Sequence, residues 1–247
     1  MKVTIATILA CSLTMGVSHA VAEEDSEQTV RRIYFDQVKS DQNAEFIALS
    51  KEWNQCLATN NAGHGWSVWE RQTGQLNRYA FVIDGAGWAR FDQRDPAHKT
   101  CHEQFQARYT ATIESAYSSF DTRLESLSDD AEGDYTVVLV INFNLNDAPK
   151  FFENAEKLTA AARAGGYTHP HVWWHSRGGD SGANFYLVVL LENFAALDSG
   201  PNFWAAAISE LGEETVQSLR SENNQAIDHS WEDIWTWNEE LSYTPAE

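Results

Sequence analysis

The sequence predicts an α+β fold made of two tandem β-α-β-β-α-β repeats. The chain repeats itself at a nearly constant spacing, and both copies show the same order of strand-like and helical segments. The matched segments are "IESAYSSFDTRLESLS" at 113–128 with "IDHSWEDIWTWNEELS" at 227–242, "GWARFD" at 87–92 with "NFAALD" at 193–198, "HGWSVWE" at 64–70 with "HPHVWWH" at 169–175, and "IYFD" at 33–36 with "INFN" at 141–144. Their spacings of 114, 106, 105 and 108 residues are typical of a tandem duplication, with repeats at 30–128 and 134–243.

The residues before the first repeat have the pattern of a secretory signal peptide. Lys2 gives the positive start, residues 3–17 are mostly apolar, and Ala20-Val21-Ala22 is a small-x-small cleavage site. A lipoprotein acylation site at Cys11 is the weaker alternative, because the apolar run before it is very short. We therefore expect residues 1–22 to be removed and the protein to be periplasmic or secreted.

Each repeat begins with a strand followed by a helix. Residues 137–146 ("VVLVINFNLN") alternate between a fully apolar row and a mixed row, with the period of two expected of a strand, and 33–36 alternates in the same way. Helical stretches follow at 44–59 and 148–164. Asparagine or glycine residues stand directly after both stretches, as at many helix ends.

Two more strands, a second helix and a closing strand complete each repeat. We expect strands at 65–71, 79–84, 171–176 and 185–192, second helices at 97–113 and 202–221, and closing strands at 117–127 and 231–241. The tetrad Gly179-Asp180-Ser181-Gly182 also surrounds the serine of trypsin-like proteases, but here it falls between two strands, and Ala162 stands where the preceding "LTAA" would need a histidine. Since glycine, aspartate and serine are common turn residues, we expect a hairpin turn there.

This element order is that of the ferredoxin-like fold. With the duplication, it makes nearly all of residues 30–243 resemble the dimeric α+β barrel superfamily, which includes antibiotic biosynthesis monooxygenase-like, stress-responsive barrel, NIPSNAP-like and chlorite dismutase-like proteins. The resemblance implies two sheets that close face to face into a barrel within one chain. It also implies relatives that are cofactor-free oxygenases and small cyclising or isomerising enzymes.

The composition limits the class of partner. A formal net charge of −19 repels phosphate backbones and anionic lipids, so we expect no nucleic-acid partner and no membrane contact after signal cleavage. Ten tryptophans provide aromatic surface for a core or an apolar pocket. We therefore expect a small-molecule ligand and no bound cofactor.

Cys56 and Cys101 remain after signal removal, and we predict that they form a disulfide. Cys56 lies near the end of one predicted helix and Cys101 near the start of the next, and these ends meet in a β-α-β-β-α-β unit. At a spacing of 106 their counterparts are Ala162 and Ala207. If the two positions are in contact in each copy, a cysteine pair in one copy can be replaced by a pair of small residues in the other.

The candidate site residues lie on strands. His171, Trp173 and His175 share one strand face, with the histidines about 13 Å apart, which is too far for one metal ion. The polar residues of the two first strands are Tyr34 and Asp36 in one copy and Asn142 and Asn144 in the other; we expect them to point into the barrel, because the apolar rows should pack under the helices. His98 and His102 have helical metal spacing but are only two ligands. We expect no metal site.

We carry three functional hypotheses. The first is a barrel that binds a small apolar or aromatic molecule in its central cavity, with His171 or His175 as base and Asn142, Asn144 or Tyr34 as hydrogen-bond donors. The second is a non-catalytic envelope or stress interaction protein whose closing strand, with Trp231, Trp235 and Trp237, forms a partner or homo-oligomer surface. The third is a haem protein like chlorite dismutase, with a cavity histidine as axial ligand.

Overall fold

The computed structural model describes residues 28–85, 87–179, 182–198 and 202–246, so the expected signal peptide at 1–22 lies outside the described residues. The strands are β1 (Val30–Val38), β2 (Ser67–Arg71), β3 (Arg78–Gly85), β4 (Ile113–Arg123), β5 (Val137–Leu145), β6 (His171–Ser176), β7 (Phe185–Leu191) and β8 (Ile227–Trp237). The helices are α1 (Asn43–Thr59), α2 (Pro96–Thr112), α3 (Ala148–Ala164), α4 (Phe203–Leu211) and α5 (Glu213–Ala226), with 3-10 turns η1 (Trp88–Asp92), η2 (Glu125–Leu127) and η3 (Phe194–Leu197).

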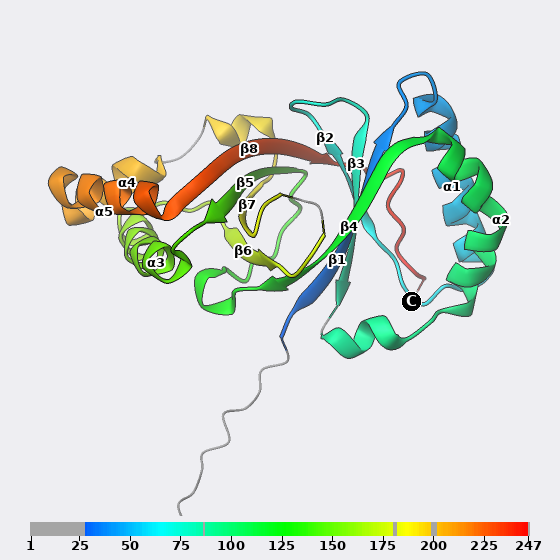
Figure 1. The fold of residues 1–247 in the computed structure, drawn as a ribbon, viewed down its shortest axis with the longest axis horizontal. Helices are drawn as coiled ribbons and strands as arrows, with labels where there is room; N and C mark the ends of the chain where they lie inside the picture. The colour runs from blue at the N-terminus through cyan, green and yellow to red at the C-terminus, as the bar shows by residue number, and fades with distance from the viewer. Residues whose placement is uncertain (1–27, 86, 180–181, 199–201, 247) are drawn as a thin grey trace, which may run out of the picture.

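The eight strands form one closed antiparallel barrel in the order β1-β3-β2-β8-β5-β7-β6-β4. Each repeat contributes a four-stranded sheet, and the two sheets join at the β2–β8 and β4–β6 seams. The helices lie outside the barrel, with α1 and α2 on one side and α3, α4 and α5 on the opposite side (Figure 1). The prediction of two ferredoxin-like repeats closing into a fused dimeric α+β barrel is confirmed.

Strand register shows the duplication directly. Trp69 of β2 is paired with Ala80, and Trp174 of β6 is paired with Tyr186, so the two tryptophans occupy equivalent places in the two sheets. Both first strands also have a pairing irregularity near their ends, at Gln37/Val38 in β1 and at Asn144/Leu145 in β5. Matching these irregularities gives a spacing of 107 between β1 and β5.

The second helix of the later repeat differs from the prediction. The sequence predicts one helix over 202–221, whereas the structure has α4 ending at Leu211 and α5 running from Glu213 to Ala226. Gly212 separates them with φ of 79°, a left-handed conformation that ends a helix and that glycine adopts without steric cost.

The predicted disulfide is present. Cys56 on α1 and Cys101 on α2 are bonded, with Cα atoms 5.9 Å apart. Their counterparts Ala162 and Ala207 are both buried in one apolar cluster between α3 and α4, which agrees with replacement of a touching pair by small residues.

The closing strand does not form the expected partner surface. Trp231 and Trp235 line the barrel interior, and Trp235 is buried. Only Trp237 is well exposed, at 39%. The expectation of a tryptophan surface on β8 is therefore wrong, because the strand turns this face inward; homo-oligomerisation itself stays a prediction.

The two repeats exchange the segments that follow their closing strands. After β4 the chain runs along β6 of the second repeat, where Leu124 N–H donates to the Trp173 carbonyl (2.9 Å). After β8 it runs along β2 of the first repeat, where Asn238 N–H donates to the Val68 carbonyl (2.8 Å). In Figure 1 the C-terminal trace accordingly lies between the first sheet and α1.

The exchanged segments pack differently in the two repeats. In the first, Leu241 and Tyr243 are buried between the sheet and its helices, where Tyr243 packs beside Trp66. In the second repeat, Asp129 stands in the place of Tyr243 and His171 in the place of Trp66. The backbone contacts show this, because Asp129 N–H donates to the His171 carbonyl as Tyr243 N–H donates to the Trp66 carbonyl. Polar residues thus replace two aromatic rings, and a cavity lies beside them.

Candidate functional site

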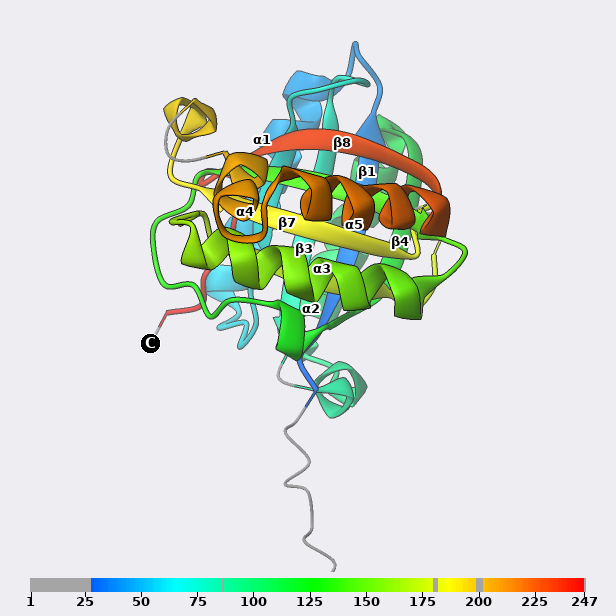
Figure 2. The same ribbon diagram turned by 90° about the vertical axis from the view of Figure 1, so that its left-hand side faces the viewer.

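A chamber of about 810 Å³ lies between the outer face of the second sheet and its helices. Figure 2 shows α3, α4 and α5 in front of this sheet. The chamber is lined by Leu139, Ile141, Phe143, Phe151, Ala155, Leu158, Thr159, Tyr167, His169, His171, Trp173, Leu187, Val189, Leu191, Ala196, Leu197, Asp198, Asn202, Phe203, Trp204, Arg220, Asn223, Asn224, Ile227, Ser230 and Glu232.

The chamber walls are mainly apolar because strand alternation places one complete apolar row there. Leu139, Ile141 and Phe143 of β5 all point to this face. Trp173 of β6 stacks on Phe143, with ring centres 5.5 Å apart, and Phe151 of α3 meets it edge-on at 5.8 Å. Such walls with a few polar groups are typical of small-molecule sites.

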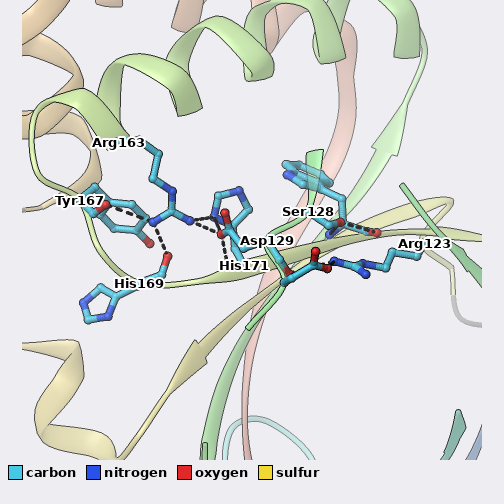
Figure 3. A network of polar contacts seen from close by, with 9 residues as sticks. Arg123, Ser128, Asp129, Arg163, Tyr167, His169 and His171 are labelled. Atoms are coloured by element: carbon cyan, nitrogen blue, oxygen red, sulfur yellow. Dashed lines mark hydrogen bonds and ion pairs between the residues drawn. The ribbon is translucent and has the colours of Figure 1, made fainter. Parts of the chain in front are cut away.

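A polar network of Asp129, Arg163 and His171 borders the chamber (Figure 3). Arg163 forms an ion pair with Asp129 and donates to the carbonyls of Tyr167 (3.1 Å) and His169 (3.0 Å). Asp129 Oδ2 also accepts from the backbone N–H of His171 at 2.8 Å. The network therefore fixes the loop that leads from α3 into β6.

The same network determines the state of the His171 ring. His171 Nδ1 lies 2.9 Å from Arg163 Nη2, from which it accepts in one tautomer, and 3.2 Å from Asp129 Oδ2, to which it donates in the other. Burial lowers the pKa of His171, with the Arg163 charge acting in the same direction and Asp129 opposing it. His171 is therefore neutral at pH 7, and its role as a base stays a prediction.

Tyr34 and Asp36 do not point into the barrel, so the predicted orientation is wrong. Asp36 accepts from the hydroxyl of Tyr109 on α2 at 2.7 Å, and Tyr34 packs against the apolar cluster under α1. Desolvation raises the pKa of Asp36. The error comes from matching 33–36 with 141–144, one residue away from the true spacing of 107, and a one-residue slip in a strand exchanges its two faces.

The other predicted residues lie in three different places. Asn142 lines the barrel interior, where its amide nitrogen is 3.4 Å from Asp233 Oδ2. Asn144 accepts from the backbone N–H of Asn184 at 3.1 Å, a contact that joins β5 to the β6–β7 connection. His175 stacks on Phe185 at 4.4 Å and does not line the chamber, although burial lowers its pKa. The structure thus groups only His171 and Trp173 in one cavity.

The barrel interior is a second hollow, of about 460 Å³. At one end Arg31 lies over the ring of Trp174 (3.7 Å) and donates to the Tyr186 hydroxyl (2.8 Å), while that hydroxyl donates to Asp121 (2.5 Å). Elsewhere Arg71 pairs with Asp233, and Arg78 donates to the Tyr117 hydroxyl. The sequence pattern places the β1 row that contains Arg31 on the helix side, so Arg31 is not predicted in the barrel, whereas the structure places it there.

His171 Nδ1 lies 3.2 Å from the Asp129 carboxylate, the kind of partner that a ligating histidine usually has, but the Arg163 guanidinium lies closer to the same nitrogen, at 2.9 Å. The haem hypothesis stays a prediction. No histidine lines the barrel interior in the part of the chain that the structure describes. Among the same residues, no group of three or more His, Cys, Asp or Glu side chains is arranged to hold a metal ion, and no helix is long and apolar enough to span a membrane.

Solved structures with the same architecture were found, although no family model and no curated protein matches the sequence. A proposed monooxygenase from Lactobacillus acidophilus superposes with a TM-score of 0.54 at 10% identity, over 89% of this chain and 98% of the other. An anthrone oxidase-like protein gives a TM-score of 0.53 at 10% identity, over 90% and 95% of the two chains. A chlorite dismutase variant from Candidatus Nitrospira defluvii gives 0.50 at 10% identity, over 86% and 92%.

The chain has the dimeric α+β barrel fold. At this level of identity the similarity establishes architecture only, because one fold hosts many chemistries. The resemblance expected from the sequence is confirmed, and function has to be argued from the cavities themselves.

Proposed function

We propose that the chamber of the second repeat binds a small, mainly apolar or aromatic molecule. The observation that carries the proposal is the 810 Å³ cavity itself, whose size lies within the range of about 300–1,000 Å³ usual for such sites. Trp204 and Leu197 line it and are also 36% and 43% exposed, so apolar surface continues from the cavity to the outside. A ligand would remove this surface from water.

His171 gives the chamber a point of polar recognition. Its ring is buried in an apolar wall and neutral, and in the tautomer in which Nδ1 accepts from Arg163, the Nε2 N–H donates to a carbonyl or phenolic oxygen on the ligand. The finer proposal is an oxygenase- or isomerase-like enzyme in which His171 polarises that oxygen. Two structures of the same fold, one described as a proposed monooxygenase and one as anthrone oxidase-like, support this class of enzyme, but the proposal does not rest on them.

Binding is tested with a matched ligand pair, fluorene and 9-fluorenone, which differ by one carbonyl group. Both should quench tryptophan fluorescence, and Ala155→Trp, which fills the chamber from α3, should abolish the effect. The control Ala160→Trp, at an exposed position of the same helix, should leave it unchanged. Unaltered binding to Ala155→Trp would contradict the proposal.

The polar contact is tested with His171→Leu. The wild-type protein should prefer fluorenone over fluorene by about 2- to 10-fold, the usual worth of one neutral hydrogen bond, and the variant should lose this preference while still binding fluorene. For the enzymatic part, dioxygen uptake with anthrone should fall in His171→Leu. Equal uptake in both proteins would refute the enzymatic part and leave the binding part standing.

A further inference from the structure

The barrel interior contains a cation that no carboxylate neutralises. Two of its three arginines are paired, Arg31 with Asp121 and Arg71 with Asp233. Arg78 forms no ion pair with any carboxylate of the described residues and instead donates to the hydroxyl of Tyr117. The third carboxylate of the interior, Asp84, is paired in register with Arg31, at the other end of β3 from Arg78. Since Arg71 and Asp233 cancel one another, Arg78 is the uncompensated charge at its own end of the cavity.

Arg78 and Tyr117 together present donors to the cavity. The Tyr117 oxygen accepts from Arg78, so its own O–H remains able to donate to another group. Burial keeps the pKa of Tyr117 above its usual value, so the hydroxyl stays protonated at neutral pH. A guanidinium and a hydroxyl side by side match the oxygens of a carboxylate.

Aromatic rings surround this pair of donors. Phe35 stacks on Tyr117 with ring centres 4.7 Å apart, and Trp235 lies 6.1 Å from Phe35. Trp69 lines the same cavity from β2. A flat ring bearing one negative charge would bury its apolar faces against these side chains while its charge meets Arg78.

We propose that the barrel interior is a second ligand site, separate from the chamber, that binds a small aromatic carboxylate through Arg78 and Tyr117. Binding would neutralise a half-buried cation whose contacts are the Tyr117 hydroxyl and the rings of Phe35 and Tyr117. The site lies on the inner face of the sheets and the chamber on the outer face of the second sheet, so each can be filled or blocked without the other.

Calorimetric titration with 2-naphthoate, against its neutral analogue 2-naphthamide, tests the proposal. Wild-type protein should bind the carboxylate at least tenfold more tightly than the amide, and Arg78→Gln should lower naphthoate affinity at least tenfold, about 1.4 kcal/mol, while changing naphthamide affinity much less. Arg94→Gln removes an exposed arginine and should change neither value. Tyr117→Phe, which keeps the ring, should give a smaller loss in the same direction.

Two blocking variants locate the site. Ala80→Leu, in the barrel wall, should abolish naphthoate binding and leave fluorene binding in the chamber intact, whereas Ala155→Trp should do the reverse. The proposal would be overturned if the wild-type protein did not bind naphthoate. It would also be overturned if folded Arg78→Gln and Tyr117→Phe both bound naphthoate as tightly as the wild-type protein, or if only Ala155→Trp lost naphthoate binding. None of these outcomes affects the proposed function of the chamber, which depends on the fluorene pair.

Discussion

The substitution Leu241→Ala tests whether the segment after β8 is part of the core of the first repeat. Leu241 is 1% exposed and packs with Phe46, Val68 and Tyr79 between α1 and the sheet. Truncating a fully buried leucine to alanine costs about 2–5 kcal/mol, because transfer energy is lost and a cavity is left. We expect about 3 kcal/mol here, since the surrounding rings are large and cannot collapse far.

For a chain of this length, each kcal/mol shifts the midpoint of thermal unfolding by about 2–4 °C, so Leu241→Ala should lower it by about 6–12 °C. The matched control is Leu127→Ala, at the equivalent point of the other exchanged segment, which is only half-buried and should cost about half as much. Far-UV circular dichroism during heating, with the disulfide intact, measures both. A shift below about 2 °C for Leu241→Ala, or one no larger than that of Leu127→Ala, would refute the packing described for the C-terminal segment.

Three further predictions concern the disulfide, one histidine and one glycine. Replacing Cys56 and Cys101 together by alanine, as found at their counterparts, removes a bridge across 45 residues and should lower the free energy of unfolding by about 4 kcal/mol; a reducing agent should then cause no further loss in the double variant. His171 has a lowered pKa in the folded state, so its contribution to stability is present above the unfolded-state pKa of about 6.5 and is lost as the pH falls through the folded-state value. Chemical unfolding at a series of pH values should therefore show a steeper loss below about pH 6.5 for the wild-type protein than for His171→Leu, and parallel curves would contradict the pKa direction. Gly165→Ala should destabilise strongly, because the added Cβ would lie 2.2 Å from the Ala206 carbonyl oxygen and separate α3 from α4, whereas Gly63→Ala meets its nearest atom at 3.9 Å and serves as the control in the same unfolding assay.

Much of the fold follows from local pattern, and the errors arise where the outcome depends on tertiary contacts. The order of elements and the Cys56–Cys101 bond could be predicted because alternation, helix ends and the duplication are all properties of neighbouring residues. The row of β1 side chains that points into the barrel could not be predicted, because "IYFD" fits "INFN" one residue out of register and both rows of β1 contain aromatic side chains. The pairing irregularities at Gln37/Val38 and Asn144/Leu145 fix the correct match.

The polar network beside the chamber was hidden from sequence for a different reason. Asp129 follows β4 of the first repeat, yet it bonds to Arg163 and His171 of the second, because the repeats exchange their closing segments. Nothing in the composition of residues 124–129 indicates this exchange. The signal that could have found it is the match of Ser128 with Ser242, whose hydroxyls accept from Trp173 N–H and Val68 N–H, both at 2.9 Å.

The difference between the repeats explains the chamber of the second repeat. The first repeat fills this space with Tyr243 and Trp66. Polar groups at the same place in the second repeat are tolerated only if their hydrogen bonds are satisfied. Asp129 accepts from both Arg163 and the backbone N–H of His171, and Arg163 Nη1 donates to two backbone carbonyls. These bonds hold the closing segment against the edge of β6, so no aromatic side chain from it enters between sheet and helices. The space beside His171 and Trp173 therefore stays open, with apolar walls from β5 and α3 and the His171 ring at its border.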